Sequence, residues 1–176
     1  MDISTPIRTL KLIAFDRIEA DGIAYPCTIG REGIAPAGEK REGDLKTPSG
    51  SFKLRGCYYR PDRLPTPNIF LPVTALTPEH GWCDDVAHAQ YNKQVILPFD
   101  GRHENLWRDD HVYDLIIPLG YNDGPIVKGA GSAIFMHLMR PDGVGTEGCI
   151  ALKREDLLSL LPRFTTDTVV TVPESV

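Results

Sequence analysis

The sequence predicts a mainly β fold, a sandwich-like or partly closed barrel arrangement with one C-terminal helix and long loops. Short apolar runs alternate with turn residues along the chain, which is typical of strands. The 15 prolines and 16 glycines are spread throughout, and this disfavours long helices because both residues weaken helix interiors. The length of 176 residues suits one well-packed core, so we expect a single domain over residues 1–176.

The N-terminal part predicts a β-hairpin. Apolar runs at Leu10–Phe15 and Ile23–Ile29 flank the turn dipeptide Asp21-Gly22. A polar, glycine-rich segment follows over residues 30–51, and its end, Thr47-Pro48-Ser49-Gly50, has proline and glycine where a tight turn needs them.

A short strand is expected at Ser51–Leu54, directly after this turn. The next stretch, residues 60–78, is rich in proline, so it should form an irregular surface connection with at most short extended pieces.

The second half predicts further strands and the helix. Apolar runs indicate strands at Gln94–Leu97, Tyr113–Leu119, Ser132–Leu138 and Thr168–Val172. Residues 153–161 have helical spacing, because three leucines fall on one face, and Pro162 should stop the helix.

Composition and charge exclude several classes of function. The net charge of −5 and the dispersed basic residues argue against a nucleic-acid surface. No apolar run is long enough to span a membrane, and the early charges Asp2, Arg8 and Lys11 do not fit a secretory signal.

The cysteines and histidines predict neither a metal site nor a cofactor. No C-x-x-C pair occurs, and no histidines share a metal-ligand spacing with cysteine or carboxylate. Cys27, Cys57 and Cys83 are interpreted as small buried residues. The histidines outside the motif below are interpreted as structural or surface residues, namely His80, His88, His103 and His111.

One pair of residues points to covalent chemistry. The apolar run Ser132–His137 ends in an imidazole, and twelve positions later Cys149 stands in Thr146-Glu-Gly-Cys-Ile-Ala-Leu. A free thiol has a pKa of about 8.5, so it needs a neighbouring base to attack a carbonyl at neutral pH. His137 is the nearest candidate for that base.

These motifs together resemble the L,D-transpeptidase catalytic domain, the YkuD-like family. The resemblance rests on Thr47-Pro-Ser-Gly-Ser-Phe52, the strand ending in His137, Thr146-Glu-Gly-Cys-Ile150 and the leucine-rich helix, and it covers the chain from about Gly30 onward. It implies a β-rich fold whose cysteine lies in a groove and acts on peptidoglycan stem peptides through a thioester.

The resemblance also implies roles for individual residues. Cys149 would be the nucleophile and His137 its base, with the backbone carbonyl of Leu138 orienting the imidazole. The backbone N–H groups of Gly148 and Cys149 would form the oxyanion hole. Losing one such donor typically costs about 10²- to 10³-fold in rate.

The chain departs from the family pattern at two positions. Glu147 stands where histidine or tryptophan is usual, and Ala151 stands where an arginine is usual. We expect Glu147 to point away from the thiol, and Arg140 or Arg154 to replace the missing arginine.

Two segments rich in aromatic and ionisable residues, 81–85 and 103–108, leave two interpretations open. They form part of the substrate groove, or they pack and cap turns, as such residues commonly do. Thr146, Arg140, Trp82 and Tyr91 are our candidates for substrate contacts. The residues for which both interpretations stand are Trp82, Asp84, Asp85, Tyr91, His103, Glu104 and Trp107.

Three functions remain in competition. The first is a cysteine-dependent L,D-transpeptidase, the second an L,D-carboxypeptidase or amidase that uses water as acceptor, and the third an inert module that binds cell wall. The expected partner is a peptidoglycan peptide, with no nucleic acid and no membrane-spanning segment. The resemblance implies the cell envelope or periplasm, whereas the N-terminal residues leave a cytoplasmic protein possible. The oligomeric state is left open.

Overall fold

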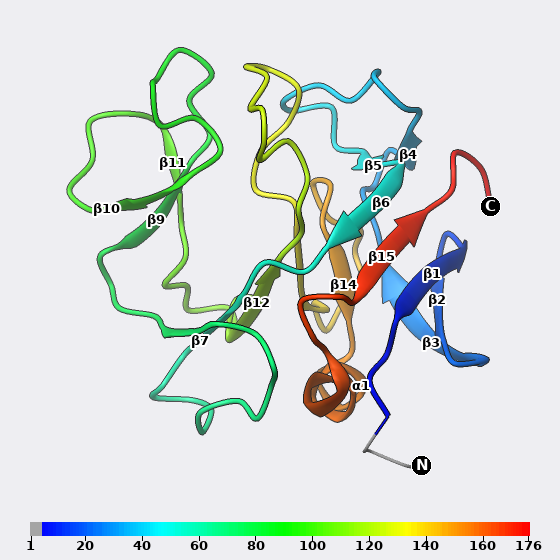
Figure 1. Ribbon diagram of the computed structural model, residues 1–176. Helices are drawn as coiled ribbons and strands as arrows, with labels where there is room; N and C mark the ends of the chain where they lie inside the picture. Colours follow the sequence, from blue (N-terminus) through cyan, green and yellow to red (C-terminus); the bar gives the residue numbers. More distant parts are fainter. Residues whose placement is uncertain (1–4) are drawn as a thin grey trace.

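The computed structural model describes residues 5–176, so Asp2 lies outside the described range (Figure 1). Most strands belong to one sheet: β1 (Thr9–Ala14), β2 (Arg17–Ala20), β3 (Ile23–Thr28), β6 (Gly50–Lys53), β7 (Cys57–Tyr59), β8 (Val73–Ala75), β12 (Leu115–Pro118), β13 (Phe135–Leu138), β14 (Ile150–Leu152) and β15 (Val169–Val172). In the described residues these ten strands form a curled, mixed half-barrel in the order β6-β15-β1-β2-β3-β14-β13-β12-β7-β8. The prediction of a mainly β fold with one C-terminal helix is confirmed.

Strands β13 and β14 are parallel neighbours near the middle of the sheet and are buried along their whole length. Successive side chains of a strand point to opposite faces, so each strand serves two environments. Met136 pairs with Ile150, and both point into the larger core. His137 pairs with Ala151, and Cys149 precedes β14 with the same parity as Ala151. The side chains of His137 and Cys149 therefore emerge on the same face, away from the larger core.

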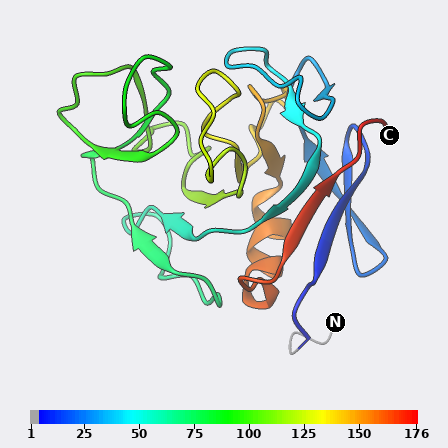
Figure 2. The same cartoon turned by 45° about the horizontal axis from the view of Figure 1, so that its top comes forward.

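The helix α1 (Arg154–Leu160) follows β14 and covers the larger core with Leu157 and Leu160. Figure 2 shows it beside β14 and β15. Acidic side chains in its first turn suit the positive end of the helix dipole. The α-helix ends before Pro162, near the predicted boundary, but the chain continues in a short 3-10 helix, Leu161–Arg163.

A second, three-stranded sheet lies to one side of β12, across the molecule from β1 to β3 in both ribbon views. It consists of β9 (His80–Cys83), β10 (Gln94–Ile96) and β11 (His103–Asn105), with β9 in the middle. A third pair, β4 (Ile34–Ala35) and β5 (Thr47–Pro48), is parallel.

The predicted single hairpin at the N-terminus is wrong, because a strand was missed. β1 pairs with β2 and β2 pairs with β3, so two hairpins follow one another. The turn at Asp21-Gly22 exists, with both residues at positive φ, but it joins β2 to β3. The missed strand, Arg17–Ala20, has only four residues, too few to stand out as an apolar run.

The predicted tight turn at Thr47-Pro48-Ser49-Gly50 is also wrong. Thr47 and Pro48 form β5, and β6 starts at Gly50. The N–H groups of Thr47 and Ser49 donate to the carbonyls of Gly33 and Ala35. The hydrogen bonds of this parallel pair are thus donated by the residues on either side of Pro48. The pair loses no hydrogen bond because proline lacks an N–H group.

The strands predicted at Tyr113–Leu119 and Ser132–Leu138 exist but are shorter, at Leu115–Pro118 and Phe135–Leu138. Ala133 has a positive φ of 52°, which ends regular extension before β13. All four cysteines are buried free thiols, as interpreted for Cys27, Cys57 and Cys83. Among residues 5–176, no helix is both long and apolar enough to cross a membrane.

Candidate active site

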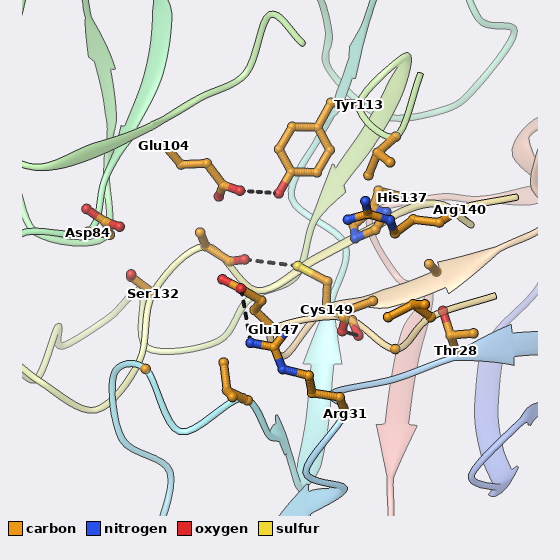
Figure 3. A pocket seen from close by; sticks show the side chains of 18 of the residues that line it. Thr28, Arg31, Asp84, Glu104, Tyr113, Ser132, His137, Arg140, Glu147 and Cys149 are labelled. Atoms are coloured by element: carbon orange, nitrogen blue, oxygen red, sulfur yellow. Dashed lines mark hydrogen bonds and ion pairs between the residues drawn. The ribbon is translucent and has the colours of Figure 1, made fainter. Parts of the chain in front are cut away.

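A cavity of about 400 Å³ lies over the sheet face that carries His137 and Cys149 (Figure 3). Thr28, Ala151 and His137 come from the adjacent strands β3, β14 and β13 and belong to its lining. Other parts of the wall come from the segment 40–45, the loop 144–147 and residues on and near β11. The sheet thus brings together two predicted residues that stand twelve positions apart in the chain.

The thiol of Cys149 is buried and has two backbone partners. Its Sγ donates to the carbonyl of Ala133 at 3.2 Å and accepts from the N–H of Phe135 at 3.3 Å. Burial raises the pKa of the Cys149 thiol to about 12, and the nearby Glu104 carboxyl adds to the rise. The resting group is therefore a neutral thiol.

The imidazole of His137 is held in one tautomer. Its Nδ1 lies 2.9 Å from the carbonyl oxygen of Leu138, and a carbonyl only accepts, so Nδ1 carries the proton and Nε2 is left as the acceptor. The ring of Tyr113 packs edge-on against it at 5.3 Å. Burial lowers the pKa of His137 to about 4, against the opposing effect of the Leu138 carbonyl.

The pair is therefore neutral at rest, in contrast to a thiolate–imidazolium ion pair. Both side chains line one cavity, where a buried, uncharged base suits proton transfer from an uncharged thiol during the attack itself. The Leu138 contact is the one that the family resemblance implies for orienting the base.

The two backbone N–H groups predicted as oxyanion donors differ in whether they already donate a hydrogen bond within the protein. The N–H of Gly148 donates to Oγ1 of Thr146 at 3.1 Å, whereas the N–H of Cys149 has no acceptor within residues 5–176. The hydroxyl of Thr146 in turn donates to the carbonyl of Cys149 at 2.6 Å. Thr146 thus braces the loop, and the Cys149 N–H is the freer donor for a developing oxyanion.

Gly148 has a structural reason to be glycine. Its φ is +139°, and a Cβ there would lie 2.9 Å from the carbonyl oxygen of Lys46. Side chains rarely adopt this conformation, and the backbone contact leaves no room for one. The segment before Cys149 is therefore pressed against the segment that carries Lys46 and Thr47.

The two departures from the family pattern have clear positions. Glu147 is exposed but lines the same cavity as Cys149, and its charge adds to the rise of the thiol pKa. Its Oε1 lies 3.5 Å from Nη2 of Arg31. Ala151 lies between His137 and Thr28 in the sheet. The hydroxyl of Thr28 is buried and has no partner in the described residues.

The two arginines proposed as replacements have different surroundings. Arg140 lines the cavity and lies 3.8 Å from Asp142 in a loose, exposed ion pair. Arg154 instead donates to Oδ2 of Asp114, a buried carboxylate that Arg63 and His111 also contact. Of the two, only Arg140 faces the candidate site.

Some residues of segments 81–85 and 103–108 line the cavity, and others pack or cap turns. Asp84, His103 and Glu104 line the cavity. Asp85 caps a turn by accepting from two backbone N–H groups, and Trp107 packs under the guanidinium of Arg60 at 3.6 Å.

The predicted substrate residues Trp82 and Tyr91 do not line this cavity. Trp82 lies on a second cavity and donates from Nε1 to Asn92 at 3.0 Å. Tyr91 is 1% exposed, and its hydroxyl donates to Glu42 at 2.5 Å. Neither side chain is placed to contact a substrate at Cys149.

Sequence reasoning missed several residues of the wall. Lys40 is only 5% exposed, and its Nζ donates to Asp44 at 2.6 Å. Glu42 accepts from the hydroxyl of Ser132 at 2.7 Å. Charged residues in a polar, glycine-rich segment give no sequence signal of burial. Thr28 and Tyr113 were missed because they stand in ordinary apolar runs.

Among the described residues, no group of three or more histidine, cysteine or acidic side chains is arranged to hold a metal ion.

Comparison with curated proteins and with solved structures gave no match. A family model does match, and it covers residues 8–172, nearly the whole chain and every site residue described above. The chain therefore belongs to the YkuD family, the L,D-transpeptidase catalytic domain.

Proposed function

We propose that the protein is a cysteine-dependent L,D-transpeptidase that acts on peptidoglycan stem peptides through a thioester on Cys149. The observation that carries the proposal is the placement of the Cys149 thiol and the His137 imidazole in one cavity, with His137 on β13 and Cys149 directly before the parallel neighbour β14. Family membership supports the substrate class. Because peptidoglycan lies in the cell envelope, we propose that the protein acts there.

The reaction scheme starts from the neutral Cys149 thiol and the neutral His137 imidazole. Nε2 of His137 takes the thiol proton as Sγ attacks the carbonyl carbon after an L-centre. The Cys149 N–H donates to the oxyanion. Collapse breaks the C–N bond, and the protonated imidazole returns its proton to the leaving amine. An acceptor amine then attacks the thioester, and Cys149 leaves as the thiol.

A matched set of variants tests this scheme. Wild-type protein, Cys149→Ala, His137→Gln and the control Cys83→Ala are incubated with a stem tetrapeptide and a D-amino acid, and products are identified by mass spectrometry. Cys83 is a buried thiol outside the cavity lining, so its loss controls for stability. We expect Cys149→Ala to abolish product and His137→Gln to lower the rate about 10²- to 10⁴-fold.

The same experiment separates the competing functions. An exchanged tetrapeptide means transfer, whereas tripeptide alone means hydrolysis. Intact-mass labelling with a carbapenem gives an independent reading: a covalent adduct on wild type and none on Cys149→Ala supports the nucleophile. Absence of an adduct on folded wild type, with binding to sacculi retained, would favour the inert module.

A further inference from the structure

The wall of the cavity carries the carboxyl group of Glu104, which the reaction scheme above does not use. Glu104 lies at the centre of β11 and lines the cavity. Figure 3 shows its carboxyl group beside the hydroxyl of Tyr113, in the same pocket as Cys149.

One oxygen of this carboxyl group is fixed and the other is available. Oε1 accepts from the Tyr113 hydroxyl at 2.6 Å. In residues 5–176 no donor contacts Oε2, and this atom is not among the fully buried ones, so it is open to the cavity. The Tyr113 ring also packs on His137, so one side chain positions both groups.

Within the part of the chain that the structure describes, no cation pairs with the Glu104 carboxyl group. The nearest guanidinium, Arg108, is paired with Asp110 through Nε at 3.0 Å and Nη2 at 2.5 Å, and it lies over the Tyr113 ring at 5.1 Å. The two other charged groups that act on it, Asp84 and Glu147, are acidic, and they are engaged by Arg102 and Arg31. A half-enclosed carboxylate without a counter-charge is unfavourable and favours either a proton or a bound cation. Consistent with this, burial raises the pKa of Glu104 to about 7.

We propose that Glu104, held by Tyr113, binds the ammonium group of the acceptor and takes one of its protons, which selects amines over water as acceptors. This proposal rests on the proposed function. The acceptor at a D-centre arrives as an ammonium ion, which cannot attack until it loses a proton.

The proton balance is as follows. Oε2 of Glu104 takes one proton from the ammonium and later releases it to solvent. The freed amine attacks the thioester carbonyl carbon, so a C–N bond forms. Nε2 of His137 takes the second proton. Collapse breaks the C–S bond, and His137 returns that proton to the Cys149 thiolate.

The test compares acceptors that differ in charge. Wild type and Glu104→Gln are given a stem tetrapeptide with a D-amino acid, which carries an ammonium group, or with hydroxylamine, which is uncharged at pH 7. Water is the third acceptor. The control is Glu155→Gln, an exposed carboxyl group on α1.

We expect Glu104→Gln to slow exchange with the D-amino acid about 10- to 100-fold, the factor lost with one hydrogen bond to a charged group. Hydroxylamine capture, hydrolysis and carbapenem labelling should stay within about twofold of wild type, as should all rates of Glu155→Gln. Tyr113→Phe should show the same selectivity with a smaller loss.

Other outcomes overturn the proposal. Equal losses with all three acceptors would mean a structural role for Glu104, and no loss would mean no role. Either result in a wild type that transfers to amines would overturn the Glu104 proposal alone. Wild type that forms an acyl-enzyme but transfers to neither amine would favour hydrolysis over the proposed transfer. Wild type that forms no adduct at Cys149 would instead overturn the proposed function.

Discussion

The hydroxyl of Thr47 donates to the carbonyl oxygen of Gly148 at 2.9 Å, across 101 positions of sequence. Oγ1 of Thr47 also accepts a hydrogen bond from the N–H of Gly30 at 2.9 Å, and Thr47 is 1% exposed. One buried hydroxyl therefore ties the loop in front of Cys149 to two other segments. This contact gives a physical reason for the Thr-Pro-Ser-Gly segment to accompany the Cys149 segment although the two lie far apart in the chain.

Thr47→Val should lower the free energy of unfolding by about 1–3 kcal/mol, because the Gly30 N–H and the Gly148 carbonyl lose a buried partner. The measurement is urea unfolding, together with carbapenem labelling of Cys149. Thr28→Val is the matched control, because its buried hydroxyl has no partner in the described residues. Equal destabilisation by both variants would contradict this account of Thr47.

Gly148→Ala should be far more damaging than Gly143→Ala in the same loop. Both glycines have positive φ, but a Cβ at Gly143 meets nothing within 4 Å, whereas at Gly148 it meets the Lys46 carbonyl. We expect Gly143→Ala to cost about 1–2 kcal/mol, the usual penalty for this conformation. Gly148→Ala should cost more and slow acylation at least about 10²-fold, since the Cys149 N–H shifts with the loop. Similar melting temperatures and acylation rates for the two variants would be inconsistent with this.

The strands around the site could be predicted because their apolar runs are long. Leu115–Pro118 and Phe135–Leu138 fall inside the predicted segments, and the helix lies within one residue of its predicted start and end. Arg17–Ala20 was missed because a four-residue strand gives little alternation. Thr47–Pro48 was predicted as a turn because Pro and Gly favour turns locally, and only pairing with a distant segment makes this one extended.

The candidate site could be predicted only in its chemistry. Cysteine and histidine are rare enough for their spacing to carry information, so Cys149 and His137 could be predicted as the reacting pair, and the structure brings both to one cavity. Tyr91 and Trp82 were chosen for residue type, but their side chains face other partners, Glu42 and Asn92. Lys40 went unnoticed because its burial depends on the fold of a loop that has no periodicity.

Arg140→Ala and Arg154→Ala should separate substrate binding from stability. Arg140 is half-exposed on the cavity wall, so its loss should raise KM for the stem peptide and leave the melting temperature unchanged. Arg154 contacts the buried Asp114, so its loss should lower stability and leave KM unchanged. Because Arg63 and His111 still contact Asp114, we expect a cost of about 1 kcal/mol. The opposite pattern would assign the family's missing arginine to Arg154.

The Cys149 thiol should react slowly with iodoacetamide at neutral pH. Its pKa is raised to about 12 by burial, so the thiolate fraction rises with pH throughout the range from 7 to 10. We expect the alkylation rate to increase about tenfold per pH unit over that range, without a plateau. The unfolded protein, whose thiols have pKa values of about 8.5, is the control and should level off. A plateau near neutral pH in the folded protein would indicate a resting ion pair with His137.

The buried imidazole should make the fold sensitive to acid. His137 has its pKa lowered to about 4, from 6.5 in an unfolded chain, so the folded protein favours the neutral ring. Above pH 6.5 the ring is neutral in both states. As the pH falls from 6.5 to 4, the unfolded state binds a proton that the folded state does not, and stability is lost. The slope is about 1.4 kcal/mol per pH unit for one proton. Wild type should therefore lose stability faster than His137→Gln across this window in urea unfolding at stepped pH, and the two slopes should converge below pH 4. Parallel curves from pH 6.5 to 4 would mean that His137 already carries its charge in the folded protein, and the neutral general base would have to be abandoned.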